Sequence, residues 1–489
     1  MAKSMTRPHA KAARRVKVSW PFNDPNADLV LRSSDGIEFY VFKNILSIAS
    51  TPLKSRIEIL PPVAEGIQTL EIRLCSTTLD QLLRLCYPVL SPRFSSVQQI
   101  EPVLKAAITY DVHAAIDVLV ESLRLNPFPW DPLQVYACAC RLSLAPEERI
   151  AATLLKSKTI EVIDTDVVDD IPAVDYIRLI KYVSIKDAVF DELPSLPLED
   201  SCTESPVDIQ PRTASPPFDE ESGGDAILQS CDSIRFYVYK AILSLTSPFF
   251  RDMFTLPQSE DVNKETPVVC MAEHSTVLHD LLSLCYPPHT TKLAFTEDIG
   301  RLRDVLSVAQ KFDMQTIISI LQDHLSRHAQ IDPGGVYAVG RSLGIQDLSE
   351  EAAKLSLRLI IEEVEGSPYW RYVLAAEYRR LRRYHFACGV AGQYVAMVQG
   401  VPSWYSLGSE RWLGCCVYPA AYMSDRRMML RDRPGDPAIT SFEQFLRHAA
   451  SQTDGLCRRC SSDLDKMQVF CNDFGTEIHR RIDEVPLSG

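Results

Sequence analysis

The sequence "EFYVFKNILSIAS" (residues 38–50) returns almost unchanged as "RFYVYKAILSLTS" (residues 235–247). The similarity starts earlier, at Asp28 and at Asp225, and holds a constant spacing of 197 residues. Before the helical part of each stretch, apolar residues alternate on both sides of a short polar turn, which predicts a strand, a tight turn and a second strand. Apolar residues at helical spacing then predict a helix.

The similarity continues further along the chain. "LDQLLRLCYP" (residues 79–88) matches "LHDLLSLCYP" (residues 278–287), and a pair of amphipathic helices is predicted after each. "DPLQVYACACRLSL", from Asp131, then matches "DPGGVYAVGRSLGI", from Asp332. Because the matched positions are apolar or form turns, we interpret the two copies as a duplicated α/β domain with a helical extension, and not as a repeated reactive motif.

The 33 residues "ELPSLPLEDSCTESPVDIQPRTASPPFDEESGG" (192–224) separate the copies. They are rich in Pro, Ser, Asp and Glu and carry little to bury, which predicts a flexible acidic linker.

Length and charge limit the functions to consider. The chain has 489 residues, which suggests two or three domains, and a formal charge of −13, which argues against a surface devoted to nucleic acid. The basic segment before Val18 contains no acid; it is either a nuclear or nucleic-acid-touching arm or a disordered tail, and we favour the tail. The longest uncharged stretch (residues 386–409) is broken by Gly and Pro, so we predict no membrane span.

The 14 cysteines form no dense framework and no secretory signal is recognisable, so we expect an intracellular protein with reduced thiols, in the nucleus or the cytoplasm. Two close pairs in the C-terminal region are zinc candidates. A redox pair is an alternative for the second of them, because Arg458 and Arg459 favour thiolates, and ordinary buried cysteines are the interpretation we prefer. The candidate metal ligands are Cys415, Cys416, Cys457 and Cys460.

Other signs of catalysis are missing from the sequence. It has no phosphate-binding loop, dinucleotide fingerprint, zincin helix or nucleophile elbow. His274 and His279 are five residues apart and would not share a helix face as a ligand pair. We therefore predict a protein that is not an enzyme and needs no cofactor, with zinc as the open alternative.

Each copy resembles a BTB/POZ domain, of the kind multiplied in fungal genomes. That family begins with Asp and an apolar strand, continues through a hairpin to Phe-x-Val-His-Lys, and then enters a Leu-rich helix. Phe42 and Tyr239 replace the family's histidine, and Tyr87-Pro88 and Tyr286-Pro287 replace its later Tyr-Thr-Gly. The positions that carry the resemblance are Asp28, Phe39, Val41, Lys43 and Leu46 in the first copy, and Asp225, Phe236, Val238, Lys240 and Leu243 in the second.

The resemblance implies a protein-interaction module that commonly forms homodimers and recruits partners such as cullin ubiquitin ligases or transcriptional co-regulators. We therefore expect a scaffold that self-associates, either between chains or between its own two copies. A cullin-ligase adaptor and a transcription-associated nuclear scaffold are both compatible with it. A zinc- or thiol-dependent protein that uses the C-terminal cysteines is the alternative from another class.

The predicted fold class is α+β, with two BTB/POZ-like α/β domains, each followed by helices, and a mainly helical C-terminal region. The predicted order is a basic tail (1–19), the first domain (20–125), its helical extension (126–190), the acidic linker (191–224), the second domain (225–328), its extension (329–365) and the C-terminal region (366–489).

Overall fold

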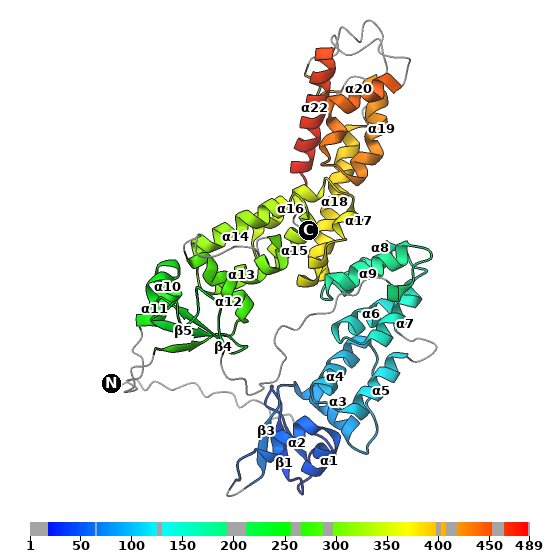
Figure 1. Cartoon of the computed structure of the whole chain (residues 1–489). Helices are drawn as coiled ribbons and strands as arrows, with labels where there is room; N and C mark the ends of the chain where they lie inside the picture. The colour runs from blue at the N-terminus through cyan, green and yellow to red at the C-terminus, as the bar shows by residue number, and fades with distance from the viewer. Residues whose placement is uncertain are drawn as a thin grey trace, which may run out of the picture. The chain divides into compact units, whose positions relative to one another are not determined.

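The computed structural model divides into two compact units. Unit 1 comprises Met1–Val168 and Tyr182–Glu192, and unit 2 comprises Asp169–Lys181 and Leu193–Gly489 (Figure 1). The structure describes residues 18–63, 66–124, 130–192, 212–255, 266–286, 297–397, 402–406, 418–451 and 464–487. The predicted basic tail therefore lies outside the described residues, apart from its last two positions.

Unit 1 contains a three-stranded sheet in the order β2-β1-β3. Strand β1 (Leu29–Arg32) is antiparallel to β2 (Glu38–Val41) and parallel to β3 (Gln68–Glu71). Alternate side chains of these strands enter a core that the helices close. These helices are α1 (Lys43–Ala49), α2 (Thr51–Glu58) and α3 (Ser76–Cys86), and they are followed by α4 (Val97–Thr109) and α5 (His113–Arg124).

A helical extension completes unit 1. It contains α6 (Pro132–Arg141), α7 (Ala145–Leu155), α8 (Ile160–Ile163) and the short 3-10 turns η1 (Asp166–Val168) and η2 (Phe190–Glu192). The carboxylate of Asp131 caps α6 by accepting the Leu133 N–H (3.2 Å). Helix α9 (Ala173–Ser184) follows η1, and its larger part belongs to unit 2.

Unit 2 repeats the same order of elements and adds one strand. Its sheet has the order β4-β6-β5-β7, in which β5 is antiparallel to β6 and parallel to β7. Helices α10 to α14 follow as α1 to α5 do in unit 1. The strands are β4 (Arg212–Thr213), β5 (Ala226–Gln229), β6 (Ile234–Val238) and β7 (Val268–Cys270); the helices are α10 (Lys240–Thr246), α11 (Pro248–Thr255), α12 (Ser275–Cys285), α13 (Ile299–Lys311) and α14 (Gln315–His328).

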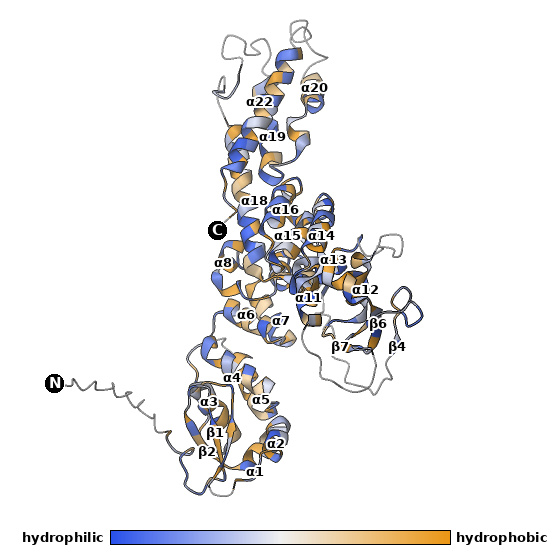
Figure 2. Ribbon diagram, turned by 90° about the vertical axis from the view of Figure 1, so that its left-hand side faces the viewer, coloured by the Kyte–Doolittle hydropathy of each residue, from blue (hydrophilic) through white to orange (hydrophobic). Residues whose placement is uncertain are grey.

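The rest of unit 2 is helical. Its extension consists of α15 (Pro333–Ser342), α16 (Gln346–Ser356), α17 (Ile361–Val364) and η4 (Pro368–Tyr372). Bands of polar and apolar residues alternate along helices such as α14 and α16 (Figure 2). The C-terminal region consists of α18 (Ala375–Val395), α19 (Tyr418–Asp432), η6 (Pro437–Thr440), α20 (Phe442–Ser451) and α22 (Leu464–Asp483). None of the helices in the described ranges is both long and apolar enough to cross a membrane.

The predicted acidic linker (191–224) is too long at its C-terminal end. Residues 212–224 are part of unit 2: β4 pairs in parallel with β6, and Phe218 is completely buried. The Phe218 ring lies edge-on to Tyr286, with 5.1 Å between ring centroids. The segment was predicted to be a linker because it is acidic and Pro-rich overall, although its Phe218 side chain completes the core of the domain. Residues 193–211 of the predicted linker lie outside the described residues.

Candidate interaction surfaces

Helices α1 and α10 are fixed to their sheets by the aspartates that open each copy. The Asp28 carboxylate accepts the Lys43 N–H (2.8 Å), and the Asp225 carboxylate accepts the Lys240 N–H (2.6 Å). Each carboxylate satisfies a backbone donor in the first turn of its helix, which that turn cannot pair internally. The predicted Asp and Lys positions therefore act together in orienting the helix.

The other positions that carry the resemblance line the cores. Their side chains are between 0 and 2% exposed, because every second residue of β2 and β6 and one face of α1 and α10 point inward. These residues are Phe39, Val41 and Leu46 in unit 1, and Phe236, Val238 and Leu243 in unit 2.

A tyrosine hydroxyl holds the N-terminus of each of these helices. The Tyr87 hydroxyl accepts the Phe42 N–H (2.8 Å), and the Tyr286 hydroxyl accepts the Tyr239 N–H (3.2 Å). Burial raises the pKa of Tyr87 to about 12, so the hydroxyl stays protonated. The tyrosine, which this chain shares with the family's Tyr-Thr-Gly, therefore positions the helix, and the departure from the family pattern is confined to the residues that follow it.

A buried serine joins the end of each helix to the next one. Ser247 donates to the Phe312 carbonyl (2.6 Å) and accepts the Phe250 N–H (3.1 Å). Ser50 makes the same two bonds in unit 1, to the Tyr110 carbonyl and from the Leu53 N–H. The positions of α1 and α10 are thus set at both ends by the same types of hydrogen bond.

With the inner face fixed, one aliphatic side chain of each helix points into solvent. Ile48 on α1 and Leu245 on α10 are both 88% exposed, the highest values among the exposed large apolar residues of the described chain. They occupy equivalent positions, each two residues after the buried leucine of its helix. An exposed aliphatic residue is ordinary by itself, but one kept at the same position of two copies marks a candidate contact surface.

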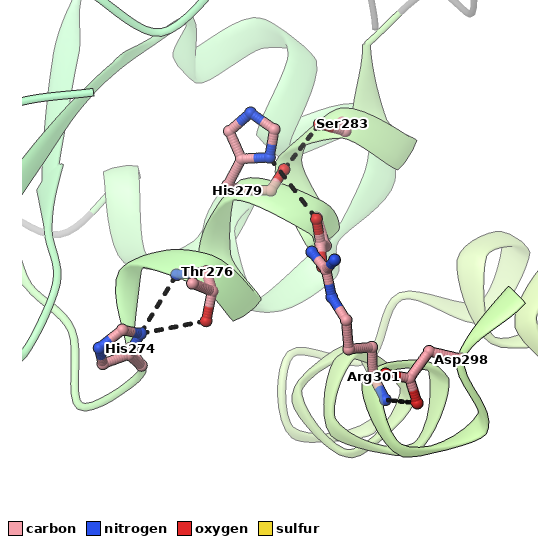
Figure 3. A network of polar contacts seen from close by, with 7 residues as sticks. His274, Thr276, His279, Ser283, Asp298 and Arg301 are labelled. Atoms are coloured by element: carbon pink, nitrogen blue, oxygen red, sulfur yellow. Dashed lines mark hydrogen bonds and ion pairs between the residues drawn. The ribbon is translucent and has the colours of Figure 1, made fainter. Parts of the chain in front are cut away.

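A polar network in unit 2 surrounds the two histidines considered above (Figure 3). The His274 ring caps α12 through the Thr276 N–H (3.4 Å), whereas the His279 ring packs edge-on against Phe218 at 5.6 Å. Arg301 donates to the Asp280 carboxylate beside them (3.0 Å). The two rings have separate neighbours, and no cluster of three or more metal-ligating side chains occurs in the described parts of the chain.

The four cysteines predicted as zinc candidates lie outside the described residues, namely Cys415, Cys416, Cys457 and Cys460. Zinc binding there stays a prediction. Cys471, the next cysteine along, is buried in α22, and burial raises the pKa of its thiol to about 12. That thiol behaves as a small apolar side chain.

Comparison with protein families places a BTB/POZ domain at residues 215–329. The matched range begins just after β4 and includes Phe218, which agrees with the ordered segment that replaces the end of the predicted linker. A comparison with curated proteins found no match. BTB/POZ domains mediate protein interactions and self-association, so unit 2 contains a protein-interaction module.

Ile48 and Leu245, the most exposed large apolar residues among those described, were not predicted from the sequence as a site. They lie within the quoted repeat, and their exposure could have been inferred from the helical period that buries Leu46 and Leu243. Phe22 and Phe218 were missed as core residues. In both copies the phenylalanine follows a proline shortly before the first strand, a signal too short to detect without the fold.

Proposed function

We propose that the chain is a non-enzymatic protein-interaction scaffold with two BTB/POZ-type domains, one in each unit, and that these domains pair through helices α1 and α10. The pairing joins two chains or the two copies of one chain. Partner proteins are recruited by the remaining surfaces.

Two sets of contacts support a BTB/POZ-type domain in unit 1 beside the one matched in unit 2. The strand order β2-β1-β3 corresponds to β6-β5-β7, with the same parallel and antiparallel pairings. The aspartate, serine and tyrosine hydrogen bonds that hold α1 recur around α10. Similar side chains in similar contacts favour a common ancestor for the two domains.

The observation that carries the proposed pairing is the equal exposure of Ile48 and Leu245 at equivalent positions, 88% each. Covering an aliphatic side chain of this kind contributes about 1.5–3 kcal/mol. In a two-fold interface the same residue is buried twice. One substitution then removes roughly 3–6 kcal/mol, which corresponds to a loss of at least about 100-fold in the association constant.

The experiment compares Ile48→Asp and Leu245→Asp with the unchanged chain, by light scattering after size exclusion across a dilution series. Both side chains are exposed, so the substitutions create no cavity and the fold is retained. We expect association to require at least about 100-fold more protein in the variant that affects the pairing copy. Leu90→Asp and Ile331→Asp are matched controls, because Leu90 and Ile331 are 82% and 81% exposed and lie outside α1 and α10.

If the copies pair within one chain, the mass stays monomeric, and chemical cross-linking between the two domains falls in the variants instead. Unchanged association and unchanged cross-linking in both variants would refute the role of α1 and α10.

The two partner classes are separated by capture experiments. A cullin-ligase adaptor retains a purified cullin N-terminal domain in a defined two-component binding assay. A transcription-associated scaffold does not, and accumulates in the nucleus through residues 1–17. The choice between them depends on exposed surface residues that the matched fold does not specify.

A further inference from the structure

Residues 169–181 follow the extension of the first copy, yet they pack within unit 2, against the segment that follows the extension of the second copy. The two segments have related sequences. "AVDYIRLIKY" (residues 173–182) matches "AAEYRRLRRY" (residues 375–384), with Ala, Tyr, Arg, Leu and Tyr at identical positions. Each residue and its equivalent are 202 positions apart.

The contact between these segments is reciprocal. The Ala173 N–H donates to the Val373 carbonyl (3.0 Å), and the Ala375 N–H donates to the Ile171 carbonyl (2.8 Å). Ala173 and Ile171 are the equivalents of Ala375 and Val373. Exchanging the two segments therefore converts one hydrogen bond into the other.

Two residues contact their own equivalents. Pro172 forms an antiparallel bridge with Leu374, at the position between the two hydrogen bonds where a proline loses no donor. The Tyr176 ring lies 6.0 Å from the Tyr378 ring, and both side chains are completely buried. In an antiparallel contact with reciprocal hydrogen bonds, residues that meet their own equivalents lie on a local two-fold axis, as in the interface of a symmetric dimer.

The charged residues of the two segments do not follow this symmetry, and their differences indicate which segments can pair. Arg379 is 2% exposed and forms an ion pair with Asp169. The equivalents of these two residues are Ile177 and Arg371. If the second-copy segment paired with another of its own kind, Arg379 would face Arg371, and like charges would repel. If the first-copy segment paired with its own kind, Asp169 would face Ile177 and the ion pair would be lost.

A second ionic contact also joins the two segments. Lys181 lies 3.9 Å from Glu365, a carboxylate that is 7% exposed as a residue and accepts a hydrogen bond from the Tyr378 hydroxyl. The equivalent of Glu365 near the end of α8 is apolar, Ile163. A pair of two first-copy segments would therefore lose this contact, whereas Arg383, the equivalent of Lys181, would keep it in a pair of two second-copy segments. The Asp169–Arg379 ion pair is the contact that favours the mixed pair over either like pair.

We propose that Asp169–Lys181 is a built-in partner for the surface formed by Glu365 and Arg371–Arg379, and that these two segments of one chain pair as equivalent segments of a symmetric homodimer would. The pairing surface is self-complementary in its backbone, and its charges select a first-copy segment over a second-copy segment. This proposal is independent of the pairing through α1 and α10, because it uses none of their residues.

The test introduces Pro172→Cys and Leu374→Cys together in the full chain. Non-hydrogen-bonded antiparallel positions have Cα atoms about 4.5 Å apart, within the range that a disulfide spans. After mild oxidation, mass spectrometry of the single-chain band on a non-reducing gel is expected to find the 172–374 disulfide. The two single-cysteine variants and the unchanged chain identify disulfides that involve the native cysteines.

A 172–374 disulfide found only in the dimer band would overturn the proposal, because the segments would then pair between chains. The absence of this disulfide in protein whose two new thiols react with an alkylating reagent would overturn it as well. Asp169→Arg in the double-cysteine chain is expected to lower the yield of the single-chain disulfide at least several-fold, and adding Arg379→Asp is expected to restore it. A yield that Asp169→Arg leaves unchanged would refute the selection by charge.

The formation of the 172–374 disulfide and its response to the charge substitutions do not depend on α1 and α10. The 172–374 disulfide is expected to form equally in a chain that also carries Ile48→Asp and Leu245→Asp. Loss of association in that chain with retention of the disulfide would show the two pairings to be separate.

Discussion

Replacing Phe218 by alanine tests whether the segment before the second copy is part of its core. The ring is completely buried and contacts three aromatic groups, with centroid distances of 5.1 Å to Tyr286, 5.6 Å to His279 and 6.1 Å to Phe236. Removing a buried phenylalanine loses its transfer free energy and leaves a cavity, at a cost of about 3–5 kcal/mol. We expect Phe218→Ala to destabilise unit 2 by this amount.

The assay is urea unfolding followed by far-ultraviolet circular dichroism. For an m-value of about 2 kcal/mol per M, the midpoint of the unit 2 transition falls by roughly 1.5–2.5 M. Phe386→Ala is the matched control, since that side chain is 62% exposed in the same unit, and it is expected to shift the midpoint by less than about 0.5 M.

Phe22→Ala is the corresponding change in unit 1. Phe22 is also completely buried and lies edge-on to Tyr87 at 5.3 Å. We expect a loss of about 3–5 kcal/mol there too.

If Phe218→Ala shifted the midpoint no more than Phe386→Ala does, residues 212–224 would be a linker after all, and the core assignment of Phe218 would be wrong.

Two further predictions concern unit 2. A Cβ at Gly389 would overlap the carbonyl oxygen of Arg431, so Gly389→Ala is expected to lower the free energy of unfolding, measured in urea, by roughly 1–3 kcal/mol. Gly392→Ala is the control: a Cβ there has its nearest neighbour at 3.4 Å, and the substitution is expected to be neutral or stabilising. Burial raises the pKa of Asp175 to about 6, so the folded chain keeps a proton that the unfolded chain loses, and stability falls as the pH rises from about 4 to 6. The substitution Asp175→Asn removes this loss of stability, which is at most about 3 kcal/mol. We expect the urea midpoint of the variant to be higher than that of the unchanged chain at pH 7 but not at pH 4. Equal midpoints at pH 7 would contradict this prediction.

Much of the secondary structure could be predicted from the sequence that occurs in both copies. Alternation around Asp35-Gly36 corresponds to β1, a turn and β2, and Gly36 has the positive φ (79°) that such a turn requires. At the equivalent turn Ser233 carries the positive φ (62°), which serine adopts less readily, and the sequence signal was accordingly weaker there. The BTB/POZ resemblance is confirmed for residues 215–329 by the family comparison.

The sequence by itself determined the hairpin and the following helices of each copy, because helix and strand periods and turns are local properties that leave their pattern in neighbouring residues. The strands β3, β4 and β7 were not predicted from it. It did not determine which distant residues meet. The burial of Phe218, the exposure of Leu245 and the contact of Tyr176 with Tyr378 depend on positions brought together only by folding. For Phe218 the composition predicted a linker, because one apolar residue among acidic residues and prolines hardly changes the mean hydropathy of the segment. The tertiary structure decided these points because burial is a property of the whole packed chain and not of any one segment.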